Sequence, residues 1–301
     1  MISNTALFKK IFEPVFEFVQ RRERINIYIF GKLFLNISTK KITNFILKFR
    51  YLRHILKLRV LSKIRKINVA FYVSEVEKWG GDLLFQKLLQ NKNFKPIIYV
   101  AKQKNAQNNV NFQNIIDYCK NKNLPYELLY DIKKDKHINI KKFKADIIFY
   151  EQPWSIPKNQ SVIEASKHSL VCYFPYCFHS LITNFNYFDG FHGKMWKYFV
   201  ETLYHKEEYE KNFNAKNCVA LGSVKLDNYK IAKKTGNQNK KKVIYAPHHS
   251  FDEEGHRCAT FLENGDFILE LAKKYPEIEW IIRAHPEFKN KLLKYKTKEE
   301  I

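Results

Sequence analysis

The sequence predicts an α/β protein with two Rossmann-like domains, the second incomplete, preceded by a basic amphipathic helical segment. From Ile67 onwards, short apolar runs alternate with helical stretches, and the alternation resumes at Val243 after a polar linker. This alternation is typical of doubly wound parallel sheets. A third observation, a concentration of positive charge, sets apart the residues before Ile67. We therefore divide the 301-residue chain into 1–66, 67–229, 230–242 and 243–301.

Residues 1–66 carry sixteen Lys or Arg and three Glu, a balance of +13 within the net charge of +23. Apolar residues recur there at three- and four-residue steps: Ile42, Phe45, Ile46, Phe49, Leu52, Leu56 and Val60. Basic residues fill much of the remainder, the pattern of a helix lying in an anionic membrane interface. The alternative is a helix packed on the protein's own core, with a solvated basic side.

The composition predicts a folded protein of a reducing compartment. Hydrophobic residues make up 45% of the chain, and its five cysteines form no tight framework. We expect neither a signal peptide nor a membrane span, since the apolar stretch around Lys32 is short and interrupted. The predicted location is cytoplasmic, peripheral at the inner face of the plasma membrane, with an anionic membrane surface as a partner.

The order of elements follows from the apolar runs. In the first domain we expect strands over 67–74, 95–101, 145–152, 170–176 and 219–223, another at PYELLY, and helices over 79–89 and 112–120. In the second domain we expect a strand over 243–246, a helix over 261–274 and a strand over 279–282. Thr260, with Glu263 three residues later, has the signature of a capping box.

Histidines follow both predicted strands of the second domain. His248 and His249 come after the first strand and His285 after the next, each beside a proline, with Arg283 nearby. Ligands of open α/β sheets bind at the carboxyl ends of strands, so parallel neighbours would bring these imidazoles together. Imidazole and guanidinium groups suit a diphosphate.

These histidines have other interpretations. Any one of them taken alone is most often a structural polar residue. Metal binding by His248, His249, His256 and Cys258 is disfavoured, because adjacent residues on an extended chain point to opposite faces. We expect no metal and no cofactor: the chain has no Walker loop, no G-x-G-x-x-G fingerprint and no nucleophile elbow.

A further histidine, His179, ends the stretch VCYFPYCFHS of the first domain. It closes a predicted strand and is a candidate to face the second domain. The competing interpretation is a buried aromatic cluster. The aromatic stretch that follows, with Gly190 and Gly193, is expected to be a mobile loop.

The segments YAPHHS, TFLENGDFILELAKKYP and IEWIIRAHPEF resemble the CDP-glycerol glycerophosphotransferase family, GT-B-fold enzymes of teichoic acid and capsule synthesis. The resemblance covers about residues 67–288. It implies a transferase that moves a polyol-phosphate group from a CDP-linked donor to a cell-surface polysaccharide or teichoic-acid-like polyol-phosphate acceptor, releasing CMP. His285 would stabilise the diphosphate or the leaving group, and His248, Ser250 and Arg283 would bind substrate.

Two departures from the family pattern matter. The W-H-G tip that supplies the general base is missing, so His179 and then His249 are the nearest substitutes. The acidic, serine-rich motif expected after R-x-H-P is also missing, which suggests a truncated second domain. The alternatives are a GT-B glycosyltransferase that uses a sugar nucleotide, or an inactive truncated paralogue. Nucleic-acid binding is disfavoured, because no binding module is recognisable.

Overall fold

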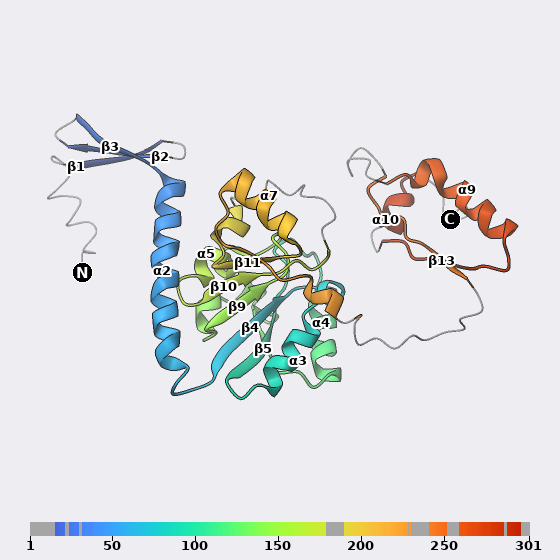
Figure 1. The fold of residues 1–301 in the computed structure, drawn as a ribbon, viewed down its shortest axis with the longest axis horizontal. Coiled ribbons are helices and arrows are strands. Elements are labelled where there is room, and N and C mark those ends of the chain that lie inside the picture. The colour runs from blue at the N-terminus through green and yellow to red at the C-terminus, as the bar shows by residue number, and fades with distance from the viewer. Residues whose placement is uncertain are drawn as a thin grey trace. The chain divides into compact units, whose positions relative to one another are not determined.

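The structure is a computed structural model that describes residues 16–21, 24–29, 32–178, 190–227, 229, 241–251, 259–285 and 288–295. The chain divides into two compact units, Met1–Ala232 and Lys233–Ile301 (Figure 1). Each unit has its own buried apolar core.

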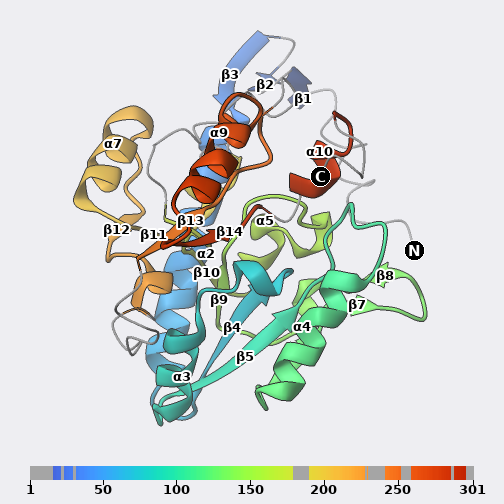
Figure 2. The same cartoon turned by 90° about the vertical axis from the view of Figure 1, so that its right-hand side faces the viewer.

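The first unit is built on a seven-stranded sheet in the order β12-β11-β10-β9-β4-β5-β6, with every pairing parallel. The strands are β4 (Ile67–Val73), β5 (Phe94–Val100), β6 (Tyr126–Leu128), β9 (Ile147–Tyr150), β10 (Leu170–Tyr173), β11 (Lys197–Val200) and β12 (Cys218–Ala220). The chain winds outward from β4 to β6, returns to β9 on the other side of β4, and winds outward again (Figure 2). The predicted α/β class with a doubly wound parallel sheet is confirmed, and the strand order reverses between β4 and β9.

Helices and short elements connect these strands. They are η1 (Val76–Lys78), α3 (Asp82–Gln90), α4 (Val110–Asn121), η2 (Ile140–Lys142), η3 (Lys158–Gln160), α5 (Val162–Ala165), η4 (His192–Lys194), α7 (Leu203–Phe213), η5 (Val224–Leu226) and a two-stranded sheet of β7 (Tyr130–Asp131) and β8 (Lys136–His137). Strand β11 and helix α7 have no counterpart among the predicted elements. Gly193, expected in a mobile loop, lies in η4; the part of that loop before Gly190 lies outside the described residues.

Aromatic side chains fill both faces of the central strand β4. On one face, the Phe71 ring lies 5.5 Å from that of Phe85 in α3 and 5.1 Å from that of Phe149 in β9. On the other face, Tyr72 stacks on Tyr150 at 4.8 Å. Central strands of parallel sheets are covered on both sides, which explains the continuous apolar run of β4.

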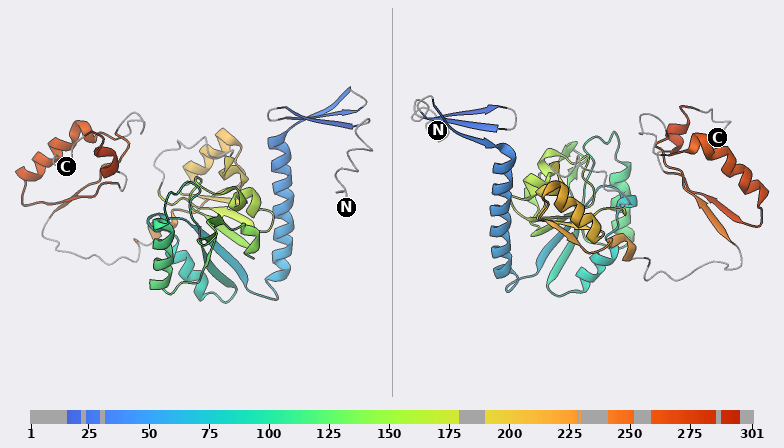
Figure 3. Two further views of the ribbon diagram at one scale, coloured as in Figure 1. Left: turned by 180° about the vertical axis from the view of Figure 1, so that it is seen from behind. Right: turned by 45° about the horizontal axis from the view of Figure 1, so that its top comes forward.

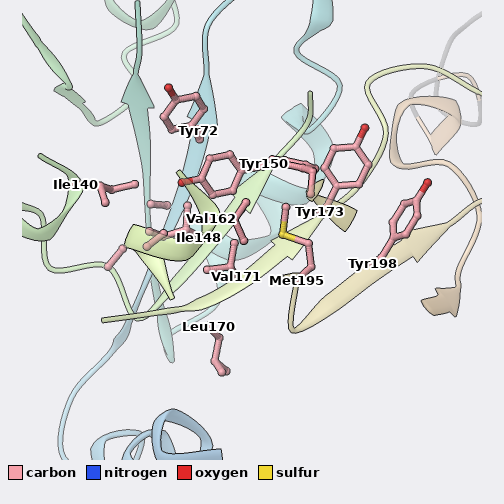
Figure 4. Close-up of a cluster of buried hydrophobic side chains, with 14 of the residues drawn as sticks. Tyr72, Ile140, Ile148, Tyr150, Val162, Leu170, Val171, Tyr173, Met195 and Tyr198 are labelled. Atoms are coloured by element: carbon pink, nitrogen blue, oxygen red, sulfur yellow. The ribbon is translucent and has the colours of Figure 1, made fainter. Parts of the chain in front are cut away.

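The tyrosine face also contains a buried amide, that of Gln160. The hydroxyl of Tyr72 donates to its side-chain oxygen (2.8 Å), and its side-chain nitrogen donates to the carbonyl oxygens of Leu129 (2.7 Å) and Ile138 (2.9 Å). The Tyr150 hydroxyl donates to the Gln160 backbone carbonyl (2.6 Å). Figure 4 shows the tyrosines among their apolar neighbours.

The prediction that residues 1–66 are helical is wrong for 16–21, 24–29 and 32–38. There, strands β1 (Phe16–Arg21), β2 (Arg24–Ile29) and β3 (Lys32–Ser38) form an antiparallel sheet, and among the described residues of 1–66 the helix is α2 (Thr39–Leu61). The reason lies in the spacing of apolar residues, which alternate with polar ones over most of β2 and from Leu35 to Ser38 in β3. A period of two is typical of strands.

Helix α2 lies alongside the seven-stranded sheet (Figures 1 and 3) and packs on it through Leu47, Tyr51 and His54. The Tyr51 hydroxyl donates to the carbonyl of Lys194 (2.7 Å), and His54 Nε2 lies 3.0 Å from the carbonyl of Ser166. Most of the apolar residues that recur at three- and four-residue steps are exposed instead. Five of them, here called the apolar stripe, are 52–73% exposed: Phe45, Phe49, Leu52, Leu56 and Val60.

The second unit contains two parallel strands, β13 (Lys242–Tyr245) and β14 (Glu279–Ile282), joined through α9 (Phe261–Lys274) and followed by α10 (Phe288–Leu292). Phe251, Phe288 and Leu292 form its core. Helix α9 begins where predicted, but the capping box is wrong. Thr260 has φ −108° and ψ 30°, not the extended backbone of an N-cap, and its side chain makes no cap hydrogen bond.

Candidate functional site

The carboxyl ends of β13 and β14 lie side by side in the second unit. Tyr245 pairs with Ile282 at the last position of the two strands. Two further hydrogen bonds extend the pairing: Arg283 N donates to Tyr245 O (2.8 Å), and His285 N donates to Pro247 O (3.0 Å). The backbone therefore holds the two histidine-bearing segments together.

Three imidazoles meet at this edge, here called the histidine cluster. The ring centroid of His248 lies 4.2 Å from that of His249 and 4.8 Å from that of His285, and His249 lies 4.2 Å from His285. The convergence expected from strand pairing is therefore seen. The chemical roles of the three side chains stay predictions.

Ser250 sets the tautomer of His248. Its backbone N–H donates to His248 Nδ1 (3.2 Å), and its hydroxyl oxygen lies 2.7 Å from the same nitrogen. Since Nδ1 accepts, a neutral His248 carries its proton on Nε2, which is then a donor. Burial, and secondly the charge of His249, lower the pKa of His248 below its ordinary value and favour this neutral form.

Other donors surround this imidazole. His249 Nδ1 is buried and has no hydrogen-bond partner in the part of the chain that the structure describes. Arg283 directly follows β14 and is exposed. Imidazole N–H groups beside a guanidinium can donate several hydrogen bonds to anionic oxygens, which is the chemistry that a diphosphate requires.

The argument from opposite faces against a metal site is wrong, because His249 lies in a bend beyond the end of β13 and the ring centroids of His248 and His249 are 4.2 Å apart. The nitrogens of the histidine cluster all lie within 4.8 Å of one another. However, Zn–N bonds of about 2 Å would place three coordinating ring centroids about 5 Å apart, with the nitrogens closer still. Rings tilted against one another with centroids 4.2 Å apart fit anion binding better than coordination.

Three of the other candidate residues, His179, His256 and Cys258, lie outside the described residues. Ser250 is buried and contacts His248, so it supports the cluster from within.

No protein-family model and no curated protein matches the sequence. Among solved structures, the chain is similar to the UDP-GlcNAc 2-epimerase from Neisseria meningitidis (16% identity, TM-score 0.46, 77% of this chain and 70% of that chain). It is also similar to the Methanocaldococcus jannaschii UDP-GlcNAc 2-epimerase (16%, 0.48, 78% and 70%) and a glycosyltransferase from Rickettsia africae ESF-5 (12%, 0.38, 75% and 70%). Similarity this low assigns no activity, and the CDP-glycerol glycerophosphotransferase family is not among these matches.

A second group of polar side chains lies in the first unit, where the strand order reverses between β4 and β9. Ser74 and Glu75 follow β4, and Glu151 and Gln152 follow β9; these four are the switch-point cluster. The side-chain amide of Gln152 donates to the Ser74 hydroxyl oxygen and joins the two strand ends. Sequence reasoning missed these residues, although a Glu–Gln pair directly after an apolar strand was an available signal.

Glu151 is only 4% exposed. The backbone N–H of Gly80 donates to its Oε2 (3.3 Å), while Oε1 is buried without a hydrogen-bond partner among the described residues. Burial raises the pKa of the Glu151 carboxyl well above its ordinary value of 4.5, against smaller opposing effects of the Gly80 N–H and Lys225. Burial therefore favours the neutral carboxylic acid over the carboxylate.

Replacing Glu151 with Gln is expected to change how stability depends on pH. Because the folded-state pKa is raised, the stabilising contribution of Glu151 is complete below its ordinary value and is lost as pH rises towards the folded-state pKa. Gln has no such proton, so the free energy of unfolding of the variant should gain on that of the wild type as pH rises above about 4.5, as measured by urea titrations. Exposed Glu127, changed to Gln, should show no such trend; equal trends for both variants would contradict a neutral Glu151.

Proposed function

We propose that the protein is a transferase that uses a nucleotide-diphosphate-linked donor, whose diphosphate binds at the histidine cluster. One observation carries the proposal: three imidazoles, whose ring nitrogens lie within 4.8 Å of one another, meet at two adjoining strand ends next to Arg283. Strand ends of this kind are where open α/β sheets bind ligands.

With a CDP-linked polyol phosphate as donor, the resemblance noted above supplies the reaction. A hydroxyl oxygen of the acceptor, a polysaccharide or polyol phosphate, attacks the β-phosphorus. The phosphoanhydride bond breaks, CMP leaves with the bridging oxygen, and the hydroxyl proton passes to a base. His285 and Arg283 stabilise the departing phosphate; His249 or His179 is the proposed base.

A sugar nucleotide is the second candidate donor, because the histidine cluster offers the same hydrogen bonds to its diphosphate. Two of the similar solved structures are described as bound to UDP-GlcNAc, which makes that molecule the comparison to test. In that reaction the acceptor attacks the sugar carbon, and the whole nucleoside diphosphate leaves.

Thermal melting of the full chain with CDP, CDP-glycerol, UDP and UDP-GlcNAc tests the donor. A ligand at about 100 times its Kd should stabilise the fold by about 2.7 kcal/mol, and we expect this shift for the cytidine compounds. A shift with uridine compounds alone would favour the sugar nucleotide. No shift with any of the four would contradict a nucleotide site. His168→Ala, which removes an exposed imidazole of the first unit, should leave the shifts unchanged.

We also propose that α2 holds the protein on an anionic membrane surface. No described helix is both long and apolar enough to span a bilayer. The apolar stripe is exposed, and the sequence of α2 contains no Asp or Glu. An apolar face edged by cations is the pattern of a helix that lies in the interfacial plane.

Two basic hollows beside α2 supply charge complementarity to lipid phosphates. One, of about 640 Å³, contains Lys40, Lys48, Lys194 and Lys216 in its wall. The other, of about 450 Å³, contains Arg53, Lys57, Lys141, Lys144 and Lys167 in its wall, together with an ion pair of Arg65 and Asp146 (2.7 Å). Each Lys or Arg near an anionic bilayer contributes about 1 kcal/mol to binding.

A further inference from the structure

We propose that the larger hollow beside α2, of about 640 Å³, binds one molecule of an anionic glycerophospholipid. The phosphate of this lipid meets the lysines of the hollow, and its acyl chains cover the apolar floor. A basic surface attracts a membrane without selecting a lipid, whereas a hollow of this size takes up a single lipid with a saturable affinity. That the lipid comes from the bilayer on which α2 lies rests on the proposed function.

Three segments of the first unit form the walls of the hollow, and hydrogen bonds hold them together. The walls are α2, residues 193–196 before β11, and residues 213–217 at the end of α7. The Tyr51 hydroxyl of α2 donates to the Lys194 carbonyl (2.7 Å). The side-chain amide of Asn217 donates to the Met195 carbonyl (3.2 Å). The hollow is therefore formed before a ligand arrives, which lowers the cost of ordering on binding.

Each wall contributes a lysine: Lys48 from α2, Lys194 from the second segment and Lys216 from the third. No Asp or Glu lines the hollow, and these three side chains form no ion pair with any other described residue. Ammonium groups on three sides of one space, without carboxylates between them, favour a compact anion. Phosphate is such an anion, and Lys is a common partner for it.

The floor between the lysines is apolar. Leu47, Met195 and Ala215 are buried there, and the ring of Trp196 is half-buried. A free phosphate gains nothing from contact with these side chains. An amphiphile gains from both parts of the hollow, because its apolar body leaves water as its charged group meets the lysines.

Leu52 connects the hollow to the apolar stripe. It is 55% exposed and lines the hollow, although it also belongs to the stripe. Phe49 and Leu56 lie three and four residues from it and so share its face of the helix. An acyl chain that leaves the hollow past Leu52 therefore reaches the surface that we propose enters the bilayer. This continuity favours a phospholipid over a soluble phosphate as the occupant.

Titrating the full chain with dihexanoyl phosphatidylglycerol, kept below its micelle concentration, tests the site without a bilayer. We expect saturation at one lipid per chain by calorimetry, with a change in tryptophan fluorescence. Trp196→Phe should remove most of the fluorescence change and retain the binding, because Trp196 is the tryptophan in the wall of the hollow.

Replacing Lys48, Lys194 and Lys216 together with Ala should weaken this binding by about 100-fold. The matched control replaces Lys92, Lys95 and Lys133, three exposed lysines of the first unit outside the hollow, and should bind as the wild type does. If the triple variant of the hollow fails to fold, Lys216→Glu alone, at an exposed position, should still weaken binding.

Two further ligands identify what the hollow recognises. Dihexanoyl phosphatidylcholine has the same chains without net charge, and glycerol 1-phosphate has the charge without chains. Each should bind at least about tenfold more weakly than the phosphatidylglycerol. The proposal would be overturned by glycerol 1-phosphate binding as tightly, by equal binding of the phosphatidylcholine, by the absence of saturable binding, or by a hollow variant that binds like the wild type.

Co-sedimentation with vesicles, measured in parallel, separates this site from membrane docking. Binding of the soluble lipid without binding to phosphatidylglycerol vesicles would refute docking alone. Binding to vesicles without binding of the soluble lipid would refute the site in the hollow alone.

Discussion

Replacing His285 with Ala is expected to lower the rate of CMP release from CDP-glycerol by about 100- to 1,000-fold, as measured for other preorganised donors to a developing anion. His285 packs against both other imidazoles of the histidine cluster, at 4.8 and 4.2 Å. In the proposed mechanism, its loss removes a donor to the departing phosphate and opens the cluster to water. The measurement is CMP release by the full chain, with a lipid-linked glycerol-phosphate oligomer as acceptor.

Three companion variants test that result further. Arg283→Lys keeps the charge but removes the planar pair of donors, so we expect a smaller loss of rate than for Arg283→Ala. His168→Ala should turn over as the wild type does. If His285→Ala retained the full rate while its melting temperature matched the wild type, the mechanism assigned to the histidine cluster would be wrong.

Replacing Phe49, Leu52 and Leu56 together with Ser is expected to weaken binding to anionic phospholipid vesicles by about 1,000-fold. Half burial of each side chain in the interface is worth about 1.4 kcal/mol, and three such terms sum to about 4 kcal/mol. The three side chains are exposed in the protein, so its melting temperature should not fall. Co-sedimentation with phosphatidylglycerol vesicles measures the partition.

A matched triple variant exists on another helix. Leu262, Phe267 and Leu269 of α9 are also exposed, and their replacement by Ser should leave vesicle binding intact. High salt, or vesicles of phosphatidylcholine alone, should weaken wild-type binding because the basic hollows then contribute little. Binding of the α2 triple variant at wild-type strength would show that another surface contacts the membrane.

The sheet of the first unit was largely predictable because its central strands are apolar on both faces. The run INVAFYV, which forms β4, has neither the alternating pattern of a strand with one solvated face nor the apolar spacing of an amphipathic helix. Strand β11 was missed because KYFV has only four residues and follows an aromatic stretch without a clear turn. Its place in the sheet depends on pairing with β10 and β12, both distant in sequence.

The orientation of α2 shows a different limit of sequence reasoning. Periodicity located the apolar stripe, but the face that packs on the sheet is the one with Leu47, Tyr51 and His54. The partners of Tyr51 and His54, Lys194 and Ser166, lie more than a hundred residues away, so no local pattern reveals them.

The two candidate sites also differ in how far local sequence patterns predict them. The convergence of His248 and His285 followed from one short parallel crossover, which local pattern predicts well. The importance of Glu151 depends on its burial and on its hydrogen bond from the Gly80 N–H, which only the packed structure reveals.

The buried amide of Gln160 has a consequence for the uniqueness of the fold. Its side chain and backbone pair with two tyrosine hydroxyls, from β4 and β9, and with two carbonyls near β7 and β8. If β4 slipped by one residue against β9, Tyr72 would move to the opposite face and these polar atoms would be left unpaired without water. Apolar neighbours alone tolerate such a slip more readily, so this polar network is what discriminates the native strand alignment from its nearest competitors.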